Sequence, residues 1–434
     1  MKEGRRLQTR DIWAAWWPLA ASWLLMGIEQ PAIAAVIARL PEPEVGLGAY
    51  GSVVFPLALL IEAPIIMLLA ASTELSRDAQ SYAKLRTFTR RMGIALTGLH
   101  ILLAATAVGP WIIGALLSVP DSVAEASGPG LWLMIPWTWA IASRRTGQGL
   151  LIRYGHSRIV GLGTGVRLLA SASVLGGGFA LGTVSGVEVG TAALSTGVLA
   201  EAAFVGFFAW RVAQRELPAR SDEAPLLTGR SFLAFYVPLA LTPIILLLIQ
   251  PVGTASIARM PEVVASLAVW PVVVGIGFVV QSVGVAYNEV VVALLGRPGA
   301  GPVLRRFARQ VAVALTVVWV VFAFTPVSRL WFTHAAGLNA RLVPMAVLGM
   351  MIATPLPATR VLQSWYQGLL VSARKTGPIT EAVLVFGVGC GAVMLAGIAW
   401  QGSAGVYVAL AAFTTGRVVQ TVWLGWRSRR LAPK

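Results

Sequence analysis

Arg360, Gln363 and Gln367 lie within an otherwise apolar stretch at positions i, i+3 and i+7. On an α-helix this spacing places the three side chains along one face. Arg144 and Gln148 form a similar pair, four residues apart in another apolar stretch. A guanidinium presents a planar fork of donors that suits a carboxylate or a phosphate, and amides complete such a contact. These residues predict a binding site for an anionic small molecule.

Carboxylates also lie deep in apolar stretches, at Glu29, Glu62 and Glu201. Ionisable groups at membrane depth are costly and are functional candidates by default. We expect these three to carry a coupled proton or to bind sodium. The alternative, for the acids as for the arginines, is a structural salt bridge inside the protein. The arginines in apolar stretches are Arg144, Arg145, Arg167, Arg360 and Arg417.

Two glutamine–proline pairs interrupt apolar stretches, at Gln30 and Gln250. Proline cannot donate a backbone hydrogen bond, so a helix bends there and leaves a carbonyl available to a ligand. We include both glutamines in the predicted substrate site. The charge differs between the two places, because Glu29 precedes the first pair and Ile249 the second.

The composition determines which elements position these residues. The 434 residues are 57% hydrophobic and 12% charged, which is too apolar for a water-soluble chain. A membrane-spanning helix needs about 20 mostly apolar residues. The sequence predicts an all-α integral membrane protein with about twelve such helices. They lie near 12–38, 47–71, 91–117, 130–152, 159–182, 188–212, 231–258, 264–295, 308–332, 342–371, 378–400 and 404–426.

The positive charge is concentrated on one side of these spans. Most of the 34 lysines and arginines fall in the two tails and in the breaks after every second span. The four that fall on the other side are Arg39, Arg259, Arg329 and Arg341. The positive-inside rule then places both termini in the cytoplasm, in a multi-pass protein of the inner membrane. The net charge of +16 is thereby explained without a nucleic-acid partner.

The sequence repeats itself at a spacing of 219 or 220 residues. "QPAIAAVIARLP" from Gln30 returns as "QPVGTASIARMP" from Gln250, and "LRTFTRRMGIALT" from Leu85 returns as "LRRFARQVAVALT" from Leu304. "GQGLL" from Gly147 returns as "YQGLL" from Tyr366. We infer two homologous six-helix lobes, 1–214 and 231–434, joined by a cytoplasmic linker at 215–230. Parallel repeats suit alternating access, in which one site opens to either face.

Three stretches carry a family resemblance: "GIEQPAIAAVIAR", "VPLALTPIILLLIQPVGTASIAR" and "PLPATRVLQSWYQGLLVSARKTG". They resemble the progressive-ankylosis-type branch of the MATE-like, or MOP, superfamily of multidrug, oligosaccharidyl-lipid and polysaccharide exporters. The resemblance implies a V-shaped exporter of twelve helices, and that branch points to small organic or phosphate-bearing anions. The chain departs from the family at Gln250, where an arginine is usual, and at Glu262, which is displaced by Met260 and Pro261.

Other chemistry is not indicated. There is no GxxxxGK[ST] run, so we expect no ATPase domain in the chain. No metal-binding spacing occurs, so we expect no cofactor beyond a transported or coupling Na⁺ or H⁺. The sequence predicts a secondary active exporter, an antiporter of a small anionic or amphipathic solute, with membrane lipids and that solute as partners. Two alternatives stay open: a lipid-linked oligosaccharide flippase, and an integral-membrane enzyme acting on lipid phosphates.

Overall fold

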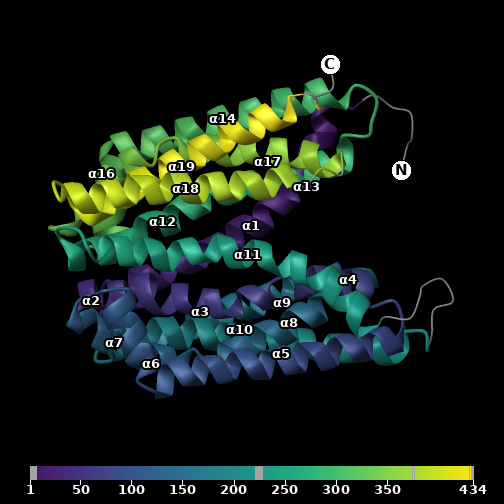
Figure 1. Ribbon diagram of the computed structural model, residues 1–434, viewed down its shortest axis with the longest axis horizontal. Helices are drawn as coiled ribbons and strands as arrows, with labels where there is room; N and C mark the ends of the chain where they lie inside the picture. The colour runs from purple at the N-terminus through teal and green to yellow at the C-terminus, as the bar shows by residue number, and fades with distance from the viewer. Residues whose placement is uncertain (1–6, 220–227, 374, 376, 430, 432–434) are drawn as a thin grey trace. The chain divides into compact units, whose positions relative to one another are not determined.

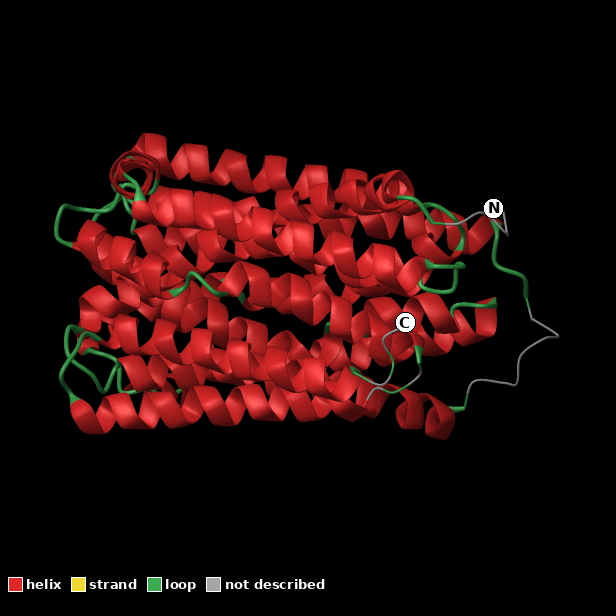
Figure 2. Cartoon of the chain, turned by 90° about the horizontal axis from the view of Figure 1, so that it is seen from above, coloured by secondary structure: helices red, strands yellow, loops and turns green. Residues whose placement is uncertain are grey.

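Every element of the described chain is a helix, as Figures 1 and 2 show. The computed structural model describes residues 7–219, 228–373, 375, 377–429 and 431. Each of the twelve predicted ranges coincides with one continuous helix or with one interrupted series of helices. The predicted all-α architecture is therefore confirmed. Residues 220–227 of the predicted linker lie outside the described residues.

The first, fifth and sixth spans of each predicted lobe are continuous. They are α1 (Thr9–Ile37), α9 (Ser157–Leu181), α10 (Gly186–Arg215), α11 (Gly229–Ile257), α18 (Gly377–Trp400) and α19 (Gly405–Ser428).

The second, third and fourth spans of each lobe are interrupted. In the first lobe they are α2 (Pro43–Gly48), η1 (Ala49–Val54), α3 (Phe55–Glu62), η2 (Ala63–Ile65) and α4 (Leu68–Leu75); α5 (Ala79–Ala105), α6 (Val108–Trp111) and η3 (Ile112–Leu116); and α7 (Asp121–Leu133) and α8 (Ile135–Arg153). In the second lobe they are α12 (Val263–Val285) and α13 (Tyr287–Leu294); α14 (Ala300–Phe324), α15 (Pro326–Leu330) and η4 (Trp331–Ala335); and α16 (Leu342–Ile352) and α17 (Leu356–Ser372).

Eight of the described helices or helix series are long and apolar enough to cross a membrane. A ninth is added if Ala79–Ala105 and Val108–Leu116, which meet at 77°, form one span. The helices α8 and α19 are not in this set, and they carry Arg144, Arg145 and Arg417. The polar residues of interest thus lie on the least apolar spans.

The chain divides into two compact units, one of which is discontinuous in sequence. The N-terminal unit is Val36–Ala255, and the C-terminal unit is Met1–Ala35 with Ser256–Lys434. Most of α1 therefore belongs with the second half of the chain, and most of α11 with the first. The predicted lobe boundaries follow the sequence repeat, whereas these units follow packing, so the lobe boundaries stay a prediction.

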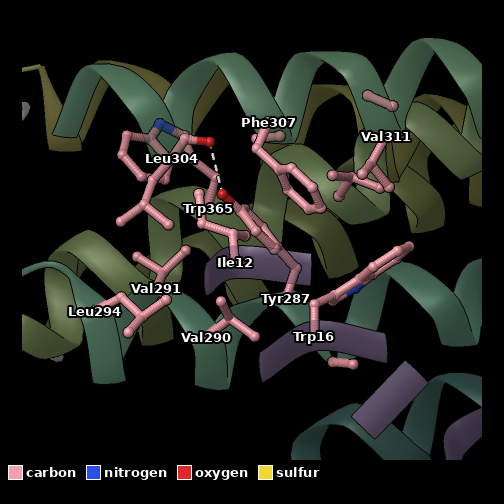
Figure 3. Packing of buried hydrophobic residues seen from close by; sticks show 14 of the residues in the cluster. Ile12, Trp16, Tyr287, Val290, Val291, Leu294, Leu304, Phe307, Val311 and Trp365 are labelled. Carbon is pink, nitrogen blue, oxygen red and sulfur yellow. Dashed lines mark hydrogen bonds between the residues drawn. The ribbon is translucent and has the colours of Figure 1, made fainter. Parts of the chain in front are cut away.

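Aromatic packing explains the place of α1 in the C-terminal unit (Figure 3). The indole Nε1 of Trp16 donates to the backbone carbonyl of Val283 over 3.1 Å, and its ring lies 5.5 Å from that of Phe307. Tyr287 stacks on Phe307 at 5.6 Å and donates to the carbonyl of Leu304 over 2.6 Å. The polar edge of each large ring is thus satisfied while its faces are buried.

An equivalent arrangement holds α11 in the N-terminal unit. Phe232 lies 4.5 Å from Phe88 of α5, ring to ring, and Tyr236 donates to the carbonyl of Pro64 over 2.5 Å.

The same close helix contacts recur in both units at the repeat spacing. A Cβ added to Gly149 would lie 2.4 Å from Cβ of Ser72, and one added to Gly368 would lie 2.6 Å from Cβ of Val291. Both partners are related by 219 residues. Small residues permit such approaches between helices in a membrane.

The repeat spacing changes from 220 to 219 between the first and third spans, and the fold shows where. Pro41 and Pro261 differ by 220 residues, whereas Ser72 and Val291 differ by 219. Between them the N-terminal unit has a π-helical turn, η1, where the C-terminal unit has the continuous helix α12. A π-helical turn accommodates one extra residue. We therefore use an offset of 219 from this point onward.

Candidate functional site

The interior of the N-terminal unit holds a charged cluster centred on Glu201 of α10. Arg144 of α8 lies with Nη1 2.5 Å from Oε2 of Glu201, and Gln148 donates from Nε2 to Oε1 over 2.9 Å. Arg144 and Gln148 are one helical turn apart, so both reach the same carboxylate. Arg167 of α9 contributes a second guanidinium, with Nη1 3.9 Å from Oε2. Glu201 is fully buried, and these groups fix its charge in place.

Glu62 belongs to the same cluster but is bound less completely. It is the last residue of α3, just before the 3₁₀ turn that contains Pro64, and it is 5% exposed. Its Oε2 is buried and receives no hydrogen bond. Arg145, Arg144 and Arg167 attract its carboxylate through Coulomb forces. The cluster therefore contains three cations, two carboxylates and one carboxylate oxygen that is available to a further donor or cation.

The C-terminal unit holds a second polar cluster, between α17 and α19, that is built on amides. Gln363 donates from Nε2 to Oε1 of Gln420 over 3.2 Å and to Oγ1 of Thr421 over 2.9 Å. Arg417 donates from Nη1 to Oε1 of Gln420 over 2.9 Å. Its guanidinium also lies over the ring of Phe386, 4.2 Å from the centroid, a cation–π contact.

Arg360 lies on α17 close to this cluster and is half-buried. Within the described residues its guanidinium donates no hydrogen bond and joins no ion pair. It is near enough to Arg417 for the two cations to repel each other. In the part of the chain that the structure describes, no carboxylate pairs with either arginine. An uncompensated pair of half-buried cations is costly and favours an anionic ligand.

The two clusters occupy equivalent positions in the repeat. With the 219-residue offset, Arg144 corresponds to Gln363 and Glu201 to Gln420. The partners in each pair are 57 residues apart, so an ion pair in one unit replaces an amide pair in the other. Glu62 corresponds to Gln281. The chain has placed both of its carboxylates in one cluster and none in the other.

The cations that the C-terminal cluster does have are at different positions. Arg360 corresponds to Ile141, and Arg417 to Val198. The two units therefore share a backbone arrangement and differ in their chemistry. Gln420 and Thr421 were not predicted from the sequence as site residues, although the offset from Glu201 was a signal that pointed to Gln420.

The remaining predicted residues are not drawn into one site. Gln367 is half-buried, one turn beyond Gln363 on α17. Glu29 is 5% exposed and Gln30 is half-buried on α1, in the C-terminal unit. Gln250 is half-buried on α11 in the N-terminal unit, and its backbone carbonyl accepts from Oγ1 of Thr254 over 3.4 Å. The structure thus joins Arg144, Gln148, Glu62 and Glu201, which the sequence had divided between substrate binding and ion coupling.

A metal centre has no support in the described residues, where no group of three or more His, Cys, Asp or Glu side chains is placed to hold an ion.

Comparison with known proteins adds the fold. No protein-family model matches the chain, and no curated protein matches its sequence. Solved structures do match over nearly its whole length. A multidrug resistance MATE family transporter of the MOP superfamily, in its inward-facing conformation, aligns with a TM-score of 0.61 and 14% identity over 99% of this chain and 96% of that one.

The chain has the fold of a MATE transporter of the MOP superfamily.

Two further structures extend the MATE-like comparison. The lipid II flippase MurJ aligns with a TM-score of 0.66 and 11% identity, covering 95% of this chain and 87% of that one. A MOP superfamily transporter from Pyrococcus furiosus aligns with a TM-score of 0.60 and 14% identity, covering 97% of this chain and 96% of that one. The likeness to the progressive-ankylosis-type branch stays a prediction.

Proposed function

We propose that this MATE-like protein is a secondary active transporter that exports a small organic or phosphate-bearing anion by alternating access. The observation that carries the anion assignment is Arg360, half-buried beside Arg417 and unpaired within the described residues. The related MOP transporter from Pyrococcus furiosus supports variation of this kind, because its binding pocket is described as having reversed polarity.

The C-terminal cluster has the donors that an anion needs. Arg360 has an uncommitted planar fork, which suits bidentate contact with a carboxylate or phosphate. Arg417 adds a second positive charge and is held in place by Gln420 and Phe386. Gln363 is fixed by the amide network, and Gln367 lies one turn further along the same helix. We propose that Arg360 makes the main contact and that Arg417 strengthens it electrostatically.

The N-terminal cluster is proposed to couple transport to a proton or sodium gradient. Oε2 of Glu62 is buried and accepts no hydrogen bond, so it is able to take a proton or contact a cation. Glu201 holds Arg144 in place and has less freedom to do so. Glu29 is a second candidate, on a different helix and in the other unit. Arg144, Gln148, Gln30 and Gln250 remain proposed contributors to substrate binding.

The same inference extends to the cellular setting. We propose a multi-pass protein of the inner membrane with both termini in the cytoplasm, embedded in lipid and driven by an ion gradient. Neither nucleic acid nor an ATPase domain of its own has a role in this account, and transport takes the place of catalysis.

A flippase for lipid-linked oligosaccharides is the second candidate. It is favoured by the alignment with MurJ, which has a TM-score of 0.66. In this case the two arginines of the C-terminal cluster would grip the pyrophosphate of the lipid carrier.

Uptake into liposomes that contain the purified protein tests the proposal. Labelled citrate, labelled pyrophosphate and a cationic dye are followed separately under an imposed pH gradient and under an imposed sodium gradient. We expect one of the gradients to drive an anion, and Glu62→Gln to abolish the drive while leaving downhill exchange of the anion intact. Movement of the dye alone would refute the anion assignment. Movement of a fluorescent lipid pyrophosphate, with no soluble anion transported, would favour the flippase.

A further inference from the structure

The N-terminal unit carries a groove that the proposed transport mechanism does not use. It has a volume of about 420 Å³ and lies where α5 and α10 both pack on α8 (Figure 1). Arg86 and Arg90 of α5 line it, together with Trp139 of α8 and Trp210 of α10. The groove therefore combines positive charge with aromatic surface.

The two arginines lie on one face of α5, one turn apart. Both are exposed, and neither forms a hydrogen bond or ion pair with any described residue. They stand in the first turns of α5, which starts at Ala79, on the side that the charge distribution predicts to be cytoplasmic. A pair of free guanidiniums at this level faces the head groups of the lipid bilayer.

The rest of the groove is suited to an acyl chain. Trp139 is 41% exposed and Trp210 is 57% exposed. Trp139 closes one end against α5, because a Cβ on Gly93 would lie 2.8 Å from its ring. Gly206 of α10 has open space where a side chain would be, with no atom within 4 Å. The exposed rings and this gap leave an apolar channel beside the arginines.

An equivalent groove recurs in the C-terminal unit, between α17 and α19. It has a volume of about 560 Å³ and is lined by Arg305 and Gly425, which correspond to Arg86 and Gly206 at the 219-residue offset. Arg429 adds a second cation there. A basic residue and a glycine thus mark the same groove in both units.

We propose that the groove of α5, α8 and α10 binds an anionic phospholipid from the cytoplasmic leaflet. Its phosphate contacts Arg86 and Arg90, and an acyl chain lies over Gly206 between Trp139 and Trp210. Charge complementarity selects the occupant, because the arginines are unpaired and the remaining lining is largely apolar or weakly polar. The site is separate from the buried clusters of the transport mechanism.

Native mass spectrometry of the full-length protein in detergent tests this. The protein is titrated with dioleoyl-phosphatidylglycerol and, separately, with dioleoyl-phosphatidylcholine. We expect tighter binding of phosphatidylglycerol, and the double substitution Arg86→Gln with Arg90→Gln to weaken it by about tenfold or more. The matched control is Arg91→Gln, because Arg91 is exposed on the same helix at the same level but does not line the groove. It should change the affinity by less than about twofold.

Two further arms keep the outcome decisive. Gly206→Leu fills the groove without changing its charge and should also weaken phosphatidylglycerol binding, since the added side chain meets open space in the free protein. Inorganic phosphate in large excess should not compete, because the acyl chain contributes to binding. Equal affinity for the two lipids, equal losses in the Arg91 control and the double variant, or full competition by phosphate would each overturn the proposal.

Discussion

Glu201 and Gln420 occupy equivalent positions in the repeat, and each accepts hydrogen bonds from the facing helix of its own unit. The sequence alone predicted that Arg144, Gln148 and Glu201 are buried polar residues in helices, and it left open whether the arginine binds a substrate or a glutamate. The structure pairs Arg144 with Glu201. Periodicity could not have shown this, because it defines the face of one helix and not which residue of another helix that face meets.

The pair should respond asymmetrically to substitution. Glu201→Gln leaves Arg144, Arg145 and Arg167 with only Glu62, so we expect it to destabilise the protein by about 3–5 kcal/mol, as breaking a buried ion pair does. Arg144→Gln should cost less, because Gln148 and Arg167 still face Glu201. The double variant reproduces the amide pair of the C-terminal unit and keeps the net charge of the cluster, so it should recover most of the loss.

Thermal unfolding in detergent measures these three variants against the wild type. A double variant whose loss equals the sum of the two single losses would show that the residues do not act as a pair.

At the scale of the elements, the sequence was sufficient for the number and the limits of the spans. Hydropathy identifies a span whether or not it is interrupted, because the interruptions are themselves apolar. For the same reason it could not reveal the π-helical turn at Ala49–Val54 or the bend of 77° after Ala105. The 220 and 219 spacings in the sequence did contain the extra residue, but only the structure shows that η1 accommodates it.

Close contacts between helices make a second prediction. Gly149→Ala should destabilise the protein by about 1–3 kcal/mol, because the new Cβ would lie 2.4 Å from Cβ of Ser72 and 2.6 Å from the backbone oxygen of Leu69, which cannot yield easily. Gly161→Ala on α9 is the control, since nothing lies within 4 Å of its added Cβ. It should be neutral or stabilising by up to about 1 kcal/mol.

The melting temperatures of the two glycine variants, measured in one detergent, provide the comparison. Equal effects of both substitutions would contradict the close approach of α4 and α8.

At the scale of the whole molecule, the sequence repeat and the packing divide the chain differently. The echoes between Gln30 and Gln250 define two halves of similar length, whereas α1 and α11 each pack with the other half. Local sequence could not have shown this, because Trp16 meets Val283 and Phe307, which are more than half the chain away. Two similar scaffolds with different buried charges support a division of labour, with ion coupling in the N-terminal unit and anion binding in the C-terminal unit.

Anion uptake by an Arg360→Gln variant tests this division most directly. The account predicts that, in liposomes, the KM for the transported anion rises at least about tenfold, because a charge-assisted contact is lost. The control Arg309→Gln removes an exposed arginine of α14 in the same unit and should leave the KM unchanged. An unchanged KM in Arg360→Gln, or an equal rise in the Arg309 control, would contradict the account.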